Sequence, residues 1–191
     1  MFGLALLHPK HDKKIWKAAL KKDRTLLYNL GCEEARRLYS LHRKVAGYIH
    51  KKKSFMRFKL SETGVLYSEV KLEYPIERNL LIHFHKRFPL FYIVIKSRKK
   101  SWWISPEGNI DWKKEEIKKV VKELDKEAKN NSIVKGMEFN EDWWPEYYES
   151  QFIRQRKNLK LMRKQMPRYL LEEDSEEARI YLRTKPLKDF L

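Results

Sequence analysis

The sequence has one cysteine, Cys32, in 191 residues. A single cysteine forms no internal disulfide and cannot build a Cys-rich zinc or iron–sulfur site. We therefore expect a reducing compartment, the cytoplasm. Long apolar runs are also missing, because the opening segment Met1–Leu7 is short, follows no basic residue and runs into His8-Pro9. It predicts a first strand or a buried N-terminal segment, not a signal peptide or a membrane span.

Several motifs of catalysis are absent too. The chain has no Gly-rich phosphate loop and no nucleophile elbow, so nothing supports nucleotide hydrolysis or serine-type acyl transfer. Two histidine pairs, His8/His11 and His83/His85, lie close in sequence, but neither has a carboxylate set nearby. Two-metal nuclease sites need clustered Asp and Glu. We expect no metal site and no other cofactor.

Positive charge is abundant. Lys and Arg number 43 against 26 Asp and Glu, a formal net charge of +17. Such an excess costs self-repulsion that a polyanionic partner would offset. Lys and Glu enrichment also suits a thermophile's surface, but there Glu usually balances Lys. The excess therefore favours a nucleic-acid partner, and no amphipathic helix with exposed large apolar residues suggests a membrane partner.

Periodicity predicts the elements. The predicted helices span about residues 14–30, 38–49, 75–88, 117–128 and 146–165. The predicted strands span 54–60, 65–72, 91–96 and 101–104, which pair as two hairpins. We predict an α+β domain with an antiparallel sheet of about four strands, helices packed on one face and a long basic C-terminal helix. The helix at 117–128 is expected to be a solvated peripheral element. One domain would span 1–169, followed by an acidic then mixed tail, 170–191.

The most basic junction lies where the second helix should meet the first strand, at His50-Lys51-Lys52-Lys53. Alternation from Ser54 would put Phe55 and Arg57 on one charged face, shared with Tyr67 of the returning strand. An ordinary strand with a solvated outer face has the same pattern. In the 146–165 helix, five cations share one arc: Arg156, Lys157, Lys160, Arg163 and Lys164.

Three motifs in order resemble a known family. They are His50-Lys-Lys-Lys53-Ser-Phe55-Met-Arg57-Phe58, then His83-Phe84-x-Lys-Arg87-Phe88-Pro89, then Arg156-Lys-Asn158 followed by Met166-Pro167. Over about residues 45–169 the chain is similar to an uncharacterised bacterial and archaeal family labelled DNA metabolism or DNA repair proteins. The resemblance implies a domain that accompanies a radical-SAM-type repair protein and is sometimes fused to a uracil-DNA-glycosylase-type domain.

This chain departs from that family's pattern at two places. The family tends to carry Asp in the strand where this chain has Lys96, so a catalytic role resting on that Asp is in doubt. Its Met-Pro motif is usually followed by a basic pair and Tyr-Trp, where this chain reads Arg168-Tyr169.

The combined features predict a DNA-binding protein of repair or base metabolism. As a DNA glycosylase it would excise uracil or another damaged base, with His50 and Asn158 as catalytic residues in a pocket for a flipped base. Structural roles are the alternative for both: His50 could cap its helix and Asn158 could bond backbone. The other reading is a non-enzymatic single-stranded DNA- or RNA-binding module that assists a repair partner, with a tryptophan of the second hairpin stacking on bases. The predicted nucleic-acid-binding residues are Lys53, Phe55, Arg57, Tyr67, His83, Arg87, Arg154, Arg156, Lys160, Arg163, Lys164 and Arg168.

Overall fold

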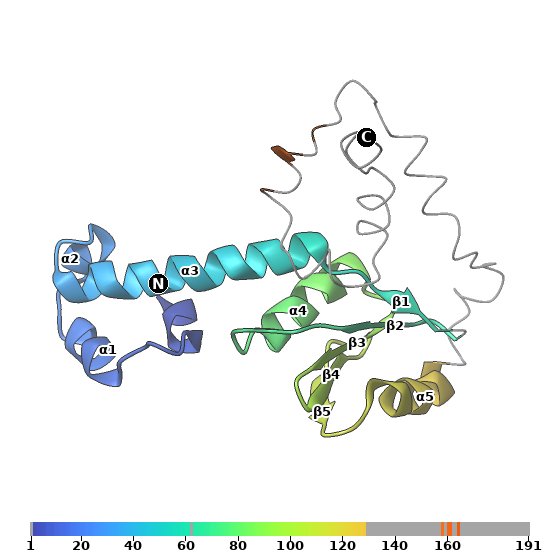
Figure 1. Cartoon of the computed structure of the whole chain (residues 1–191). Coiled ribbons are helices and arrows are strands. Elements are labelled where there is room, and N and C mark those ends of the chain that lie inside the picture. Colours follow the sequence, from blue (N-terminus) through green and yellow to red (C-terminus); the bar gives the residue numbers. More distant parts are fainter. Residues whose placement is uncertain (1, 62, 129–157, 159, 162–163, 165–191) are drawn as a thin grey trace, which may run out of the picture. The chain divides into compact units, whose positions relative to one another are not determined.

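The computed structural model describes residues 2–61, 63–128, 158, 160–161 and 164. The chain divides into two compact units, Met1–Lys135 and Gly136–Leu191. Every helix and strand discussed below belongs to the first unit, and that unit is described by itself (Figure 1). The single domain over residues 1–169 stays a prediction.

The N-terminal part of the first unit is helical. A short 3-10 helix, η1 (Gly3–Leu7), precedes α1 (Lys13–Leu20) and α2 (Arg24–Tyr28). The opening segment is thus a helical turn and not a strand, but it is anchored by buried Phe2 and Ala5. The single helix predicted over 14–30 is two helices, because Asp23 starts a new one by accepting a hydrogen bond from the Thr25 backbone N–H (2.9 Å).

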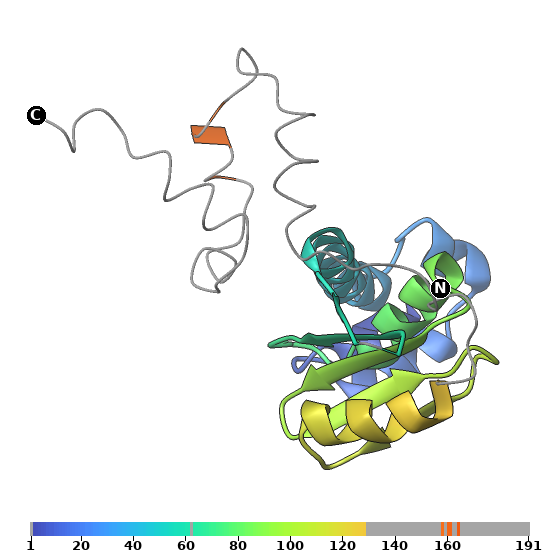
Figure 2. The same ribbon diagram turned by 90° about the vertical axis from the view of Figure 1, so that its right-hand side faces the viewer.

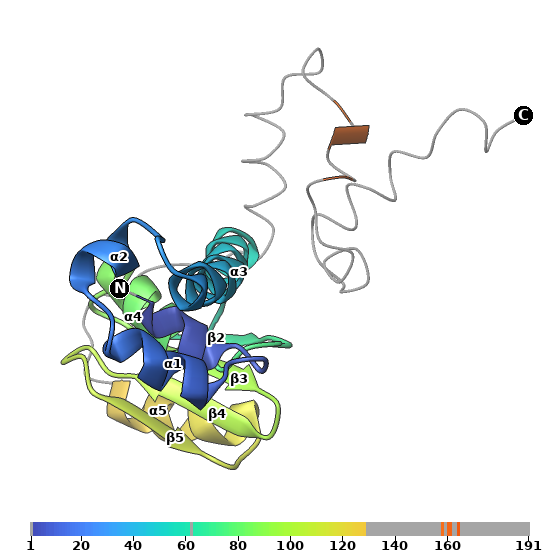
Figure 3. The ribbon, with the colours of Figure 1, turned by 90° about the vertical axis from the view of Figure 1, so that its left-hand side faces the viewer.

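The next helix, α3 (Glu33–Phe55), has 23 residues and is about 34 Å long at 1.5 Å per residue. Its first half packs on η1 and α1 through Ala35 and Leu38, in a cluster with Phe2. Its second half contributes Val45 and Ile49 to the core beside the sheet. Figure 1 shows α3 running from the N-terminal helices toward the sheet, and Figure 3 looks along this helix with α1 and α2 toward the viewer. The helix continues through Phe55, so the strand predicted from Ser54 begins later.

The sheet has five strands in the order β1-β2-β3-β4-β5. Their bounds are β1 (Lys59–Leu60), β2 (Val65–Glu69), β3 (Tyr92–Ser97), β4 (Lys100–Ile104) and β5 (Ile110–Lys113). Both predicted hairpins are confirmed, since β1 pairs with β2 and β3 with β4 in antiparallel register. The two hairpins join through a parallel β2–β3 pair, and α4 (Glu77–Arg87) makes the connection between those strands. The fifth strand was not among the predicted strands; it directly follows the turn-forming residues Pro106 to Asn109.

Helices cover both faces of the sheet, which corrects the prediction of helices on one face only. Side chains alternate along β3: Ile93 and Ile95 join α4 residues in one core cluster. Val94 points the other way and packs in a second cluster with Val120 and Leu124 of α5 (Ile117–Ala128). Figure 2 shows α5 and α4 on opposite sides of the sheet. Therefore α5 is the cover of a second face and not a solvated peripheral element.

Two further findings concern membrane-spanning helices and the predicted basic helix at 146–165. No helix among the described residues is long and apolar enough to cross a membrane. Of the predicted basic helix at 146–165, the structure describes Asn158, Lys160, Leu161 and Lys164, and the last three have helical backbone. The long basic helix as a whole stays a prediction.

Candidate nucleic-acid interface

The candidate interface lies where the C-terminal turns of α3 meet α4. The α3 helix ends in a run of lysines. Cations in the last turn stabilise a helix, because they interact favourably with its dipole. Met56 then leaves the helix in an extended conformation, and its N–H donates to the Lys52 carbonyl (2.9 Å). Phe58 follows and packs edge-on against Phe84 of α4, with ring centroids 4.7 Å apart. This aromatic contact fixes the segment after α3 onto α4.

His83 of α4 has a distinctly basic environment. Burial lowers the pKa of His83, and the positive charges of Lys53, Arg87 and Lys86 lower it further. Each of the charged groups that shift this pKa is a cation. Burial, and after it the neighbouring cations, thus both favour the neutral imidazole of His83 over the charged one.

Arg57 and Arg87 extend this positive surface. Both side chains are exposed. Arg57 Nη1 donates to the backbone oxygens of Ser54 (3.2 Å) and Met56 (3.5 Å), which helps satisfy carbonyls at the end of α3. The guanidinium of Arg87 lies 5.6 Å from the ring centroid of Phe88. The structure thus brings Lys53, Arg57, His83 and Arg87 to the same end of the α3–α4 pair.

Lys52 is the lysine of this run that turns inward. Its side chain is 3% exposed, and its Nζ lies 5.6 Å from the ring centroid of Tyr48. The Tyr48 hydroxyl in turn donates to the Lys71 carbonyl (3.3 Å) and accepts from the Glu73 N–H (3.0 Å). Burial of Tyr48 raises the pKa of its phenol. These contacts connect the end of α3 to the chain after β2.

The two remaining junction residues are placed by α3. His50 is exposed on the helix and precedes its end by five residues, so it does not have the capping role that was its structural alternative. Its carbonyl accepts from the Ser54 hydroxyl (3.0 Å). Phe55 is the last residue of the helix and is half-buried, whereas it was expected in a strand.

Tyr67 is not brought to this cluster. It pairs with Lys59 across the β1–β2 hairpin and packs against the α5 core. The α3–α4 side of the sheet is the opposite face. The expectation of a shared face depended on a strand that included Phe55 and Arg57, and that strand is only Lys59–Leu60.

The C-terminal candidates belong to the second unit. Arg154, Arg156, Arg163 and Arg168 lie outside the described residues. Asn158, Lys160 and Lys164 are exposed. The Asn158 Oδ1 accepts a hydrogen bond from the Leu161 backbone N–H (2.9 Å), the bond that an N-cap residue makes. Asn158 therefore has the backbone-bonding role that was its structural alternative.

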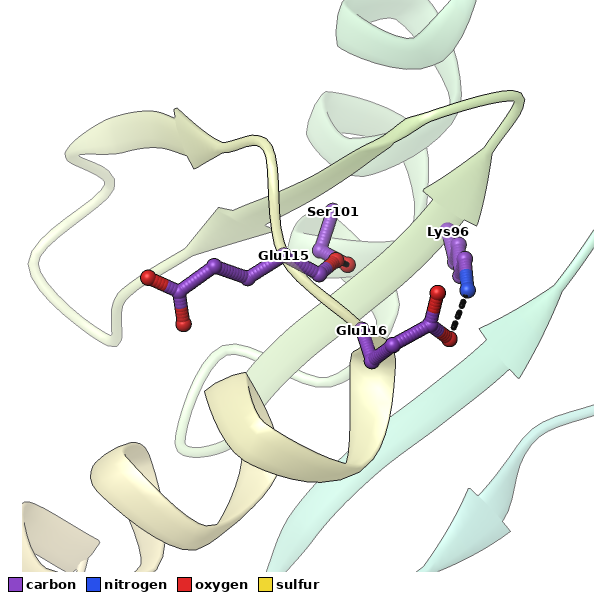
Figure 4. Close-up of polar contacts among 4 residues, drawn as sticks. All are labelled: Lys96, Ser101, Glu115 and Glu116. Atoms are coloured by element: carbon purple, nitrogen blue, oxygen red, sulfur yellow. Dashed lines mark hydrogen bonds and ion pairs between the residues drawn. The ribbon is translucent and has the colours of Figure 1, made fainter.

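Lys96 has a structural partner. It stands in β3, with its side chain 15% exposed, and forms a salt bridge with Glu116 at the start of α5 (Figure 4). The salt bridge lowers the pKa of Glu116, first through the hydrogen bond and then through the charge of Lys96. The neighbouring Ser101 hydroxyl donates to the Glu115 carbonyl (2.8 Å). At this position a cation ties the sheet to the α5 helix.

One aromatic cluster was missed by the sequence prediction. Trp102 and Trp112 are paired across β4 and β5, with ring centroids 5.8 Å apart. The ammonium of Lys100 lies 3.6 Å from the Trp112 ring centroid and 5.7 Å from that of Trp102. Only the recognition of β5 as a strand would have revealed this cluster.

Metal-ligating side chains are dispersed in the part of the chain that the structure describes. There, no three His, Cys, Asp or Glu residues are grouped so that they could hold an ion.

A family model described as a domain of unknown function, DUF4130, matches residues 9–173. No curated protein matches the chain, and no solved structure matches it. The match agrees with the resemblance to an uncharacterised family. Its description contains no reference to DNA repair.

Proposed function

This chain belongs to the DUF4130 family of unknown function, and from that premise we propose that it is a DNA-binding protein of repair or base metabolism. The contact surface in this proposal is the junction of α3 and α4, with Lys53, Arg57, His83 and Arg87 as its core. The C-terminal cations Arg156, Lys160, Arg163 and Lys164 are proposed to contribute further phosphate contacts.

The observation that carries the proposal is the positive potential at His83. Apart from burial, the charges that lower its pKa come from Lys53, Arg87 and Lys86. Like charges gathered on one surface repel one another, and an anionic ligand relieves that repulsion. Phosphate groups would relieve it, because arginine forks and lysine ammonium groups are their usual protein ligands.

The geometry supports binding better than base excision. A glycosylase holds a flipped base in an enclosed pocket. His50, however, is exposed on the surface of a helix, and the Asn158 oxygen accepts from backbone. The glycosylase version, with these two as catalytic residues, is therefore the second form of the proposal. RNA is the alternative ligand, since phosphate contacts do not distinguish it from DNA.

The pathway in this proposal has a separate basis. Partnership with a radical-SAM-type repair protein or a glycosylase domain rests on the resemblance of the sequence motifs alone. It is tested by co-purification and is independent of whether the chain binds DNA.

A binding titration with a matched charge control tests the proposal. Lys53→Ala with Arg87→Ala should weaken binding to labelled DNA and reduce the slope of log K against log salt by about two, because each lost phosphate contact removes about one. The control is Lys122→Ala with Lys126→Ala, which removes the same charge from the exposed surface of α5. Equal loss in both double variants would show a general charge effect and refute the junction as the contact surface.

An activity arm separates binding from excision. Oligonucleotides that carry uracil, hypoxanthine or an oxidised base are incubated with the full chain and treated with alkali. Strand cleavage that is lost in His50→Ala while binding persists would replace the binding proposal with the glycosylase. Salt-sensitive binding without cleavage supports the binding form.

A further inference from the structure

The exposed face of α3 continues far beyond the junction. After the first turn, the exposed residues of this helix are Arg36, Arg37, Ser40, Arg43, Lys44, Gly47, His50, Lys51 and Ser54. Residues 35–55 contain neither Asp nor Glu. The helix therefore presents a face made only of cations, one histidine and small residues, which we call the α3 basic face.

The α3 basic face has an ordered layout. Its residues repeat every seven positions, so they fall into three rows along the helix: Arg36, Arg43 and His50; Ser40, Gly47 and Ser54; Arg37, Lys44 and Lys51. At about 100° per residue, the row of small residues lies about 40° from the first row and about 60° from the third. Small side chains thus form a shallow track with basic residues along both sides.

The fold does not explain this layout. A Cβ added to Gly47 would meet nothing within 4 Å, so no packing contact requires glycine there. Glycine also weakens a helix interior relative to alanine. The salt bridges Lys96–Glu116 and Lys113–Glu123 lie on other elements, and the cations of this face form none with the described residues. The cations of the face are therefore not neutralised by an acidic side chain in that part of the chain.

We infer that the α3 basic face binds the phosphate backbone of duplex DNA, an inference that rests on the proposed function and extends its contact surface. One strand lies over the row of small residues, and the two cationic rows reach its phosphates from both sides. From Arg36 to Lys51 the helix rises about 22 Å, the axial length of six to seven base pairs.

The composition of the face selects a duplex over other anionic partners. It exposes no aromatic ring, whereas single-stranded binding relies on rings that stack with bases. It exposes no large apolar side chain, which a helix on an anionic membrane needs as an anchor. A rigid helix with cations at regular intervals instead matches a rigid polymer with regularly spaced phosphates.

The charge test uses Arg36→Gln, Arg37→Gln and Arg43→Gln together, in the full chain. We expect duplex DNA affinity to fall by at least about tenfold and the salt slope to decrease by about three. Single-stranded DNA affinity should change by less than about twofold, because this face offers no stacking. The matched control is Lys118→Gln, Lys122→Gln and Lys126→Gln on the exposed surface of α5, which should bind duplex DNA as the wild type does.

A second variant keeps every charge. Gly47→Leu places a bulky side chain in the row of small residues, and it should reduce duplex affinity severalfold at a helix content and melting temperature no lower than those of the wild type. Gly47→Ala should melt at a higher temperature than the wild type, because alanine stabilises a helix interior.

The outcomes separate this inference from the proposed function. If the Arg36/Arg37/Arg43 variant and Gly47→Leu bind duplex DNA like the wild type while the Lys53/Arg87 variant loses binding, the α3 inference is wrong and the proposed function stands. If the wild type binds no DNA, both are wrong. Tighter binding of an RNA duplex than of a DNA duplex would overturn the choice of DNA.

Discussion

At the scale of single residues, His8 shows how burial sets a titration. Its side chain is 7% exposed, its ring centroid lies 5.3 Å from that of Tyr74, and its Nδ1 accepts from the Lys10 N–H (3.0 Å). Burial lowers the pKa of His8, followed by the charges of Lys44, Lys10 and His11. The accepting Nδ1 requires the neutral ring, so protonation would break this hydrogen bond.

The lowered pKa predicts a loss of stability in acid. The folded state binds the His8 proton less tightly than the unfolded chain, whose histidine pKa is about 6.5. The stability that neutral His8 contributes is therefore complete above about pH 6.5. It is lost as the pH falls through about 6.5 toward the lower pKa of His8 in the folded state. Urea unfolding should give a lower free energy of unfolding at about pH 5.5 than at about pH 7.5. His8→Leu should flatten this dependence; an unchanged difference between the two pH values would contradict the assignment.

Lys96 gives a second prediction at this scale. Its side chain pairs with Glu116, whose own side chain is 71% exposed. Lys96→Asp would place two carboxylates together and remove the cation that pairs with Glu116. We expect reduced stability for Lys96→Asp and recovery when Glu116→Lys is added. A double variant no more stable than the single would show that the pair is not coupled.

At the scale of elements, α5 determines whether the sheet is covered on one face or two. Leu124 is 5% exposed and packs with Val94 and Val120. Leu124→Ala should reduce the free energy of unfolding by about 2–5 kcal/mol, as for other buried leucines. The neighbouring exposed Lys122→Ala should cost less than about 0.5 kcal/mol. Similar effects of the two substitutions in denaturant melts would mean that α5 is not packed on the sheet.

The same element shows what the sequence could and could not predict. The hairpins, α4 and α5 followed from alternation and helical spacing. The second covered face was missed, although Ile93-Val94-Ile95 is a continuous apolar run of the kind that strands buried on both faces have. The strand β5 was missed because its four residues, Ile-Asp-Trp-Lys, are too few to show a clear alternation and directly follow a turn.

The candidate site was predicted unevenly for a related reason. The site residues of α3 and α4 were predicted from the sequence motifs, because residues on neighbouring turns of a helix lie close together in space. Tyr67 was assigned to the wrong face, since α3 continues through Phe55 and leaves only two residues for β1. The three rows of the α3 basic face depend on which helix positions are exposed, and the helix was predicted only as far as Ile49.

At the scale of the whole molecule, positive charge is the dominant property. The whole sequence has a net charge of +17. Among the residues that the structure describes, the longest helix, α3, carries the α3 basic face and ends at the cationic junction with α4. The two surfaces are continuous through His50 and Lys51. A polyanion that contacts both would meet cations over most of the length of α3.

The most direct test of this account is the salt dependence of duplex DNA affinity, measured by fluorescence anisotropy with the full chain. If the α3 basic face and the junction both contact phosphates, log K should fall against log salt with a slope of about −4 or steeper, since each contact contributes about −0.9. Absence of binding at low salt, or binding with a slope near zero, would contradict the central claim that this chain is a DNA-binding protein.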